Sequence, residues 1–119
     1  MYVPNVVVRD SLIDPDSPDG AALVRNSHSE RPLYRVFLYL DGLGLSFVTG
    51  VTYVLHPSFK EPTRAVFRSL ANPRCKLEIW TWGLFRVQAI ITDSQGSMTT
   101  LAHDLEYNKE FPDVKFIAA

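Results

Sequence analysis

The chain has 119 residues, a length typical of one domain, and 46% of them are hydrophobic, which is enough for a modest core. Its formal net charge is −1. This balance argues against wholesale binding to nucleic acid, which usually requires a strong basic excess. We therefore expect a single domain over residues 1–119 and regard a nucleic-acid partner as the less favoured class.

The lack of recognisable targeting signals and the cysteine content predict a cytoplasmic protein. The N-terminus lacks the charged and apolar regions of a signal peptide, and no stretch approaches the roughly 18 apolar residues of a membrane span. The single cysteine, Cys75, excludes an internal disulfide and fits a reducing compartment. We expect it to be structural or incidental rather than catalytic. The length is also compatible with one module cut from a larger protein.

Strand signals begin early in the chain. Residues 2–9 predict a strand that Pro4 weakens. Residues 10–32 have the Pro, Gly, Asp and Asn content of a loop, with room for a short strand at 21–25. Aromatic and branched side chains predict a strand over 33–40, and Asp41–Gly42 supplies a turn.

The middle of the chain contains one clear strand and one long connection. Residues 51–55 alternate in polarity and predict a strand, which Pro57 limits. Residues 60–74 are predicted to be a long loop, because Pro62 and Pro73 leave little room for a helix. This stretch is also rich in Lys and Arg, and the simplest interpretation of those charges is a solvated loop.

The last third alternates with period two. Residues 76–82, 84–92 and 98–107 each place apolar side chains on one face, with a turn at 94–97. The tail, 108–119, is predicted to be either an edge strand or a disordered end. Six to eight short strands without a helical period indicate an antiparallel sandwich or barrel.

The sequence contains no established catalytic or metal-binding motif. His28, His56 and His103 are scattered, and no HxxxH, HxH or CxxC spacing occurs. His103 lies on the apolar face of a predicted strand, where a hydrogen-bonded structural histidine is expected. Phosphate-loop and GxSxG patterns are missing from the sequence, and the His56–Ser58 pair lacks a suggested oxyanion hole. We therefore expect no enzyme activity, metal or cofactor.

Two aromatic clusters occupy predicted strand ends. The first is Leu55-His56-Pro57-Ser58-Phe59 and the second is Trp80-Thr81-Trp82-Gly83-Leu84-Phe85. Loops held by a rigid scaffold often carry binding residues. The alternatives are core packing for Trp80 and Trp82, and a plug over the end of the sandwich for Phe59.

These two clusters resemble the YEATS domain family. Members carry a His-x-Ser-aromatic loop, here His56 to Phe59, and then a Gly-Trp-Gly-x-Phe type of turn, here 81–85. The flanking stretches VFLYLDG, LSFVTGVTYVLHPSF and KEPTR are also similar to the family. The resemblance covers roughly residues 33–92 and is closest to the prokaryotic branch, pYEATS.

The resemblance implies an immunoglobulin-like antiparallel β-sandwich of about seven to eight strands. It implies a non-catalytic reader of acetylated or crotonylated lysine in a peptide or protein. Phe59 and Trp82 would form the walls of the pocket, Ser58 would bond the lysine amide, and His56 would orient Ser58. A backbone N–H near Trp82 would hold the acyl carbonyl. The implied binding residues are His56, Ser58, Phe59, Thr81, Trp82 and Gly83.

Three departures keep a second hypothesis open. Thr81 stands where the family usually has Gly and could narrow the slot or restrain the loop. Leu84 stands where an acidic residue is common. A further aromatic residue of the family has no clear match, Tyr34 being the nearest candidate. The alternative is a protein–protein interaction or adaptor domain of a bacterial signalling or defence protein that keeps the fold without binding acyl-lysine.

Overall fold

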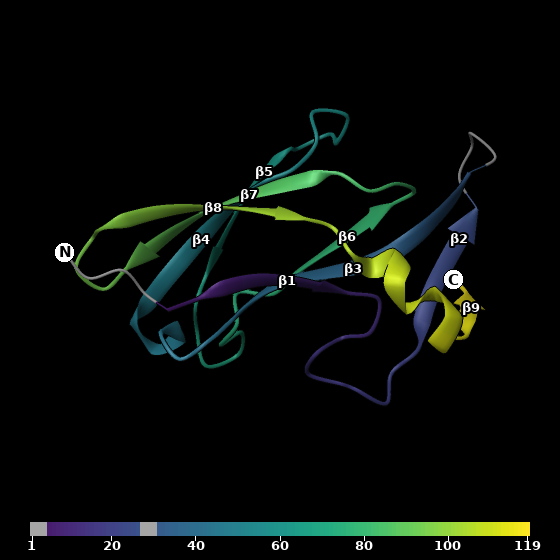
Figure 1. Cartoon of the computed structure of the whole chain (residues 1–119), viewed down its shortest axis with the longest axis horizontal. Coiled ribbons are helices and arrows are strands. Elements are labelled where there is room, and N and C mark those ends of the chain that lie inside the picture. The colour runs from purple at the N-terminus through teal and green to yellow at the C-terminus, as the bar shows by residue number, and fades with distance from the viewer. Residues whose placement is uncertain (1–4, 27–30) are drawn as a thin grey trace.

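The computed structural model describes residues 5–26 and 31–119. These residues form two β-sheets on either side of a common core (Figure 1). The elements are β1 (Val7–Ser11), β2 (Ala22–Asn26), β3 (Pro32–Asp41), the 3-10 helix η1 (Leu45–Phe47), β4 (Val48–Val54), β5 (Thr63–Phe67), β6 (Leu77–Thr81), β7 (Arg86–Asp93), β8 (Met98–Asp104), the 3-10 helix η2 (Tyr107–Asp113) and β9 (Phe116–Ala118). The architecture is an immunoglobulin-like β-sandwich, as expected.

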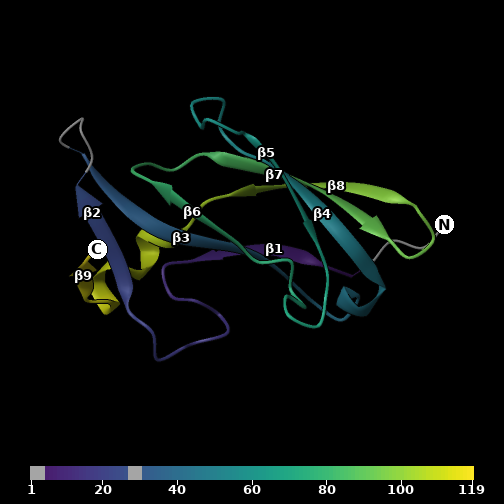
Figure 2. The same ribbon diagram turned by 180° about the vertical axis from the view of Figure 1, so that it is seen from behind.

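The first sheet is organised around β3, which has ten residues. Strand β6 pairs with it in antiparallel register from Tyr34↔Thr81 to Leu38↔Leu77. The opposite edge of β3 pairs with β2 and then with β1, also antiparallel. Strand β9 continues the sheet by pairing in parallel with β2. Figure 2 shows that β6 lies alongside β3 and that the chain then turns into β7. Strand β6 has β3 as its only partner among the described strands.

The second sheet has the order β5-β4-β7-β8, and all of its pairs are antiparallel. Side chains of a strand alternate between the two faces of its sheet. Val87, Ala89 and Ile91 of β7 therefore point to the core and are buried, whereas Arg86 and Gln88 are exposed. Burial also alternates along β6 and β8, so the predicted faces of the last three strand segments are confirmed.

The core lies between the inner faces of the two sheets. Tyr53 of β4 is fully buried, and its hydroxyl donates a hydrogen bond of 2.8 Å to the carbonyl oxygen of Cys75. Cys75 is also fully buried and has a left-handed backbone, with φ 52°. Its placement supports a structural role for this residue.

The prediction of a long loop over residues 60–74 is wrong in part. Thr63–Phe67 forms β5, which pairs with β4 from Val54↔Thr63 to Gly50↔Phe67. Pro62 precedes the strand, so its missing N–H costs no ladder hydrogen bond. Its carbonyl oxygen accepts a hydrogen bond of 2.7 Å from Leu55 N–H instead. Pro62 thus helps to close the hairpin rather than preventing it.

Other predicted elements fall close to their observed bounds. The short strand expected within the first loop is β2, and the edge-strand alternative for the tail is confirmed by β9. The first strand covers Val7–Ser11, and of the rest of its predicted range the structure describes only residues 5 and 6, which lie outside the strand. Pro4 and His28 lie outside the described residues. His103 is hydrogen-bonded as expected, with Nε2 2.6 Å from Asp10 Oδ1.

Two kinds of feature do not occur in the described parts of the chain. No helix there is long and apolar enough to cross a membrane. No cluster of three or more His, Cys, Asp or Glu side chains there could hold a metal ion.

Candidate binding pocket

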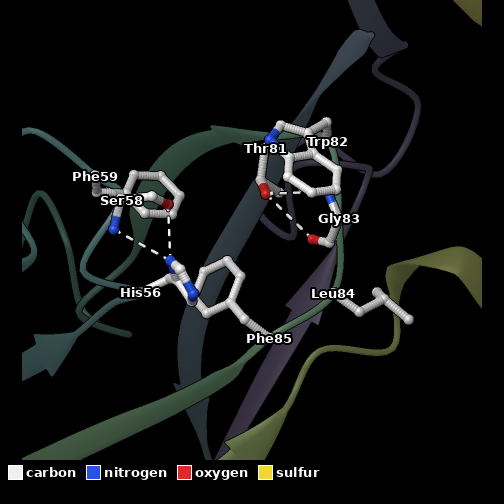
Figure 3. Close-up of a pocket in the computed structure, with 8 residues that line it drawn as sticks. All are labelled: His56, Ser58, Phe59, Thr81, Trp82, Gly83, Leu84 and Phe85. Atoms are coloured by element: carbon white, nitrogen blue, oxygen red, sulfur yellow. Dashed lines mark hydrogen bonds between the residues drawn. The ribbon is translucent and has the colours of Figure 1, made fainter.

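Two loops enclose a pocket of about 180 Å³. One loop follows β4, and the other joins β6 to β7 (Figure 3). All six residues that the resemblance implied line this pocket, together with two neighbours that it left without a role. The lining residues are His56, Ser58, Phe59, Thr81, Trp82, Gly83, Leu84 and Phe85.

The first loop holds Ser58 against His56. Phe59 N–H donates to the His56 carbonyl oxygen at 3.1 Å, which closes a tight turn. Within this turn His56 Nδ1 lies 2.7 Å from Ser58 Oγ and accepts a hydrogen bond of 3.1 Å from Ser58 N–H (Figure 3). Because Nδ1 accepts from the backbone, the arrangement fits a neutral ring with its proton on Nε2.

This tautomer determines what Ser58 can offer. A serine hydroxyl has one hydrogen to donate and two lone pairs that accept. When that hydrogen goes to His56 Nδ1, whose single lone pair is then shared with the Ser58 N–H, Ser58 Oγ is left as an acceptor. The pocket therefore presents an acceptor for a ligand N–H at this position.

Two phenylalanine rings, Phe59 and Phe85, lie beside the pair. Phe59 is half-buried and packs on Phe85 with ring centroids 5.4 Å apart. The His56 and Phe85 rings make a T-shaped contact, with their centroids 6.1 Å apart. Phe59 thus both packs against the core and lines the pocket. The sequence had placed Phe85 in the second aromatic cluster without giving it a role in binding, and its proximity to Phe59 and His56 follows from the pairing of β4 with β7.

Thr81 shapes the second loop through its hydroxyl. It is 6% exposed, and its Oγ1 donates to Gly83 O at 3.1 Å and accepts from Gly83 N–H at 3.3 Å. The hydroxyl of Tyr107 also donates to Gly83 O, at 3.0 Å. Burial raises the pKa of Tyr107 to about 12, so this donor keeps its proton at physiological pH. Of the two effects expected of Thr81, the contacts show the restraint, and the pocket beside it remains open.

Trp82 lies at the mouth of the pocket and is 55% exposed. The core-packing alternative is therefore wrong for this residue. The guanidinium carbon of Arg31 lies 4.2 Å from its ring centroid. Trp80 is half-buried, and Arg25 stacks on it at 4.1 Å.

Tyr34 does not line the pocket. It belongs to a separate aromatic cluster beneath η2, where its ring centroid lies 5.1 Å from Phe111, 5.2 Å from Phe116 and 6.1 Å from Tyr107. The third aromatic ring of the pocket is Phe85. The position of Tyr34 on the inner face of β3 directs it toward this cluster.

A family model for the prokaryotic YEATS domain matches residues 34–106. The chain belongs to the prokaryotic YEATS domain family. The resemblance seen in residues 33–92 is therefore confirmed. The matched range includes both pocket loops and the strands that hold them.

Individual relatives agree with this assignment. Transcription initiation factor TFIID subunit 14 of Schizosaccharomyces pombe is 33% identical over 100 residues, which cover 78% of this chain and 40% of that protein. The chain thus spans less than half of this curated relative.

Solved YEATS domains share the fold at low sequence identity. The YEATS domain of the yeast protein Yaf9, recognising an H3K122suc peptide, has a TM-score of 0.59 at 15% identity and covers 92% of this chain and 80% of its own. The same domain bound to H3K27ac has a TM-score of 0.53 at 14% identity, with 89% and 76% covered.

Proposed function

We propose that this domain is a non-catalytic binding module for acylated lysine. The observation that carries the proposal is the 2.7 Å contact between Ser58 Oγ and His56 Nδ1 in an open pocket whose other walls include Phe59 and Trp82. The Yaf9 structures, which recognise succinylated and acetylated histone peptides, support the ligand class. The expected partner here is an acylated peptide or protein in a bacterial cytoplasm.

The chemistry of an acyl-lysine matches the groups in the pocket. Acylation removes the charge of the amine, so the side chain can enter an aromatic slot without a carboxylate partner. Its amide N–H would donate to Ser58 Oγ. The acyl carbonyl then needs a donor, because a buried amide group left unpaired costs about 1–3 kcal/mol.

The N–H of Trp82 is the best candidate for that donor. Gly83 N–H is already bonded to Thr81 Oγ1. Trp82 N–H, in contrast, makes no hydrogen bond to another described residue. Trp82 could therefore contribute its ring and its backbone donor to the same acyl group.

The expected affinity is modest. Each well-placed aromatic contact contributes about 0.5–1.5 kcal/mol beyond the area that it buries. Two polar contacts and two walls in a pocket of about 180 Å³ suggest a dissociation constant on the order of micromolar.

We assign no catalytic role to the His56–Ser58 pair, because a hydrolytic pair also needs a group that orients its base. No described carboxylate bonds to His56.

Calorimetric titration with unmodified, acetyl-lysine and crotonyl-lysine peptides tests the proposal. Saturable binding should require the acyl group and be lost in Ser58→Ala and Trp82→Ala. Ser94→Ala, in the exposed turn after β7, is the matched control and should bind as the wild type does. If the folded wild type binds none of the acylated peptides, the result supports the interaction or adaptor domain instead.

A further inference from the structure

A second hollow adjoins the pocket. It has a volume of about 170 Å³ and is lined by Ser58, Phe59, Trp80, Thr81 and Trp82. Four of these residues also line the first pocket, and Trp80 is the addition. The two hollows therefore share a wall, and a peptide with its lysine in the first has a path past Trp80.

This path leads to the outer face of the first sheet, where two arginine side chains stack on tryptophan rings. Trp80 and Trp82 are two residues apart on β6 and its extension, a separation of about 6.6 Å along an extended strand. Arg25 of β2 covers the Trp80 ring, and Arg31 covers the Trp82 ring. Arg35 of β3 lies opposite Trp80 in register.

Arg25 is the cation best placed to meet a ligand. It is exposed, and no carboxylate within residues 5–26 and 31–119 lies at ion-pair distance from it. Lys76, which directly precedes β6, differs in this respect, because it contacts Asp14 and Asp16, each at 2.8 Å. A guanidinium that stacks on an indole keeps its N–H edge available for a carboxylate.

On the basis of the proposed function, we propose that the peptide recognised here carries an Asp or Glu about two residues from the acyl-lysine. Its carboxylate binds the Arg25 guanidinium beside Trp80. The spacing follows from the distance between the two indoles, which an extended ligand spans in about two residues. The domain thus selects acylated lysines in an acidic sequence context.

Single-stranded nucleic acid is the competing ligand for a surface of arginine and tryptophan. Nucleic-acid sites of this kind present open aromatic faces for bases to stack on. Trp80 and Trp82 each have one face covered by a guanidinium, and the chain has a net charge of −1. An acidic peptide therefore fits these residues better.

Acetyl-lysine peptides with Glu or Gln two positions before or after the lysine test the proposal by calorimetry. The better Glu peptide should bind the wild type about five-fold more tightly than its Gln counterpart, which equals about 1 kcal/mol. The preference should shrink between 50 and 300 mM salt, since exposed charges are screened. Arg25→Gln should abolish it, and Arg25→Lys should keep part of it.

Arg86→Gln is the matched control, because it removes the same charge from the other side of the pocket, where Arg86 pairs with Asp104. It should retain the preference for Glu. Equal binding of the Glu and Gln peptides by the wild type, or a preference that survives Arg25→Gln, would overturn the inference. Arg25-dependent binding of a single-stranded oligonucleotide that displaces the peptide would also overturn it. Loss of acyl dependence in every peptide would instead count against the proposed function.

Discussion

The carbonyl oxygen of Gly83 offers a direct test of how the second pocket loop is held. It accepts hydrogen bonds from Thr81 Oγ1 at 3.1 Å and from the Tyr107 hydroxyl at 3.0 Å. Thr81→Val keeps the side-chain shape and removes two hydrogen bonds, since Gly83 N–H also loses its acceptor. Tyr107→Phe keeps the buried ring and removes one.

The magnitudes follow from the number of bonds lost. A net contribution of about 0.5–1.5 kcal/mol for each hydrogen bond predicts a loss of about 1–3 kcal/mol for Thr81→Val and about 1 kcal/mol for Tyr107→Phe. In either single variant the Gly83 carbonyl retains one donor. In the double variant it has none, so the double variant should lose about 1 kcal/mol more than the sum of the singles.

Urea denaturation of the wild type, both single variants and the double variant measures this coupling. Thr100→Val, on the exposed face of β8, is the control for exchanging threonine for valine and should change stability little. Additive single effects would show that water replaces the lost donors at Gly83. A Thr81→Val variant as stable as the wild type would refute the account of how this loop is restrained.

Two further predictions concern groups away from the pocket. Burial raises the pKa of the Cys75 thiol to about 11, so alkylation by iodoacetamide at pH 8 should be slow in the folded protein and become rapid in urea; fast labelling of the native state would contradict its burial. Burial also raises the pKa of Glu110, which accepts hydrogen bonds from Leu12 N–H and the Ser11 hydroxyl. A group whose pKa is raised on folding destabilises the protein as pH rises through that value. The wild type should therefore lose stability relative to Glu110→Gln from about pH 4 toward pH 7; parallel pH profiles of the two unfolding free energies would exclude this effect.

Much of the fold follows from local pattern. The alternation of apolar and polar residues predicted which faces of β6, β7 and β8 point inward, because the side chains of any strand alternate across its sheet. Prediction was weakest for β5, where two flanking prolines suggested a loop. A proline before the first paired residue leaves the ladder intact, and the strand is stabilised by its pairing with β4.

The candidate site, like the fold, could be predicted from the sequence only in part. The spacing of His56, Ser58 and Phe59 from Trp82 was sufficient to nominate the two loops and the family. The roles of Phe85, Tyr107 and Arg25 were not predictable from spacing, because each reaches its partner through tertiary packing rather than local sequence. Tyr107, for example, contacts a carbonyl 24 residues earlier in the chain.

By itself, then, the sequence determined the all-β class, the family and the two loops that carry the candidate pocket, since these depend on alternation and on short motifs. Only the tertiary structure decided that Trp82 is exposed, that Thr81 restrains its loop without closing the pocket, and that a cation free of a described carboxylate partner lies on Trp80. These features depend on how strands distant in sequence are aligned side by side. That alignment is set by the joint burial of the two inner faces, which no single segment encodes.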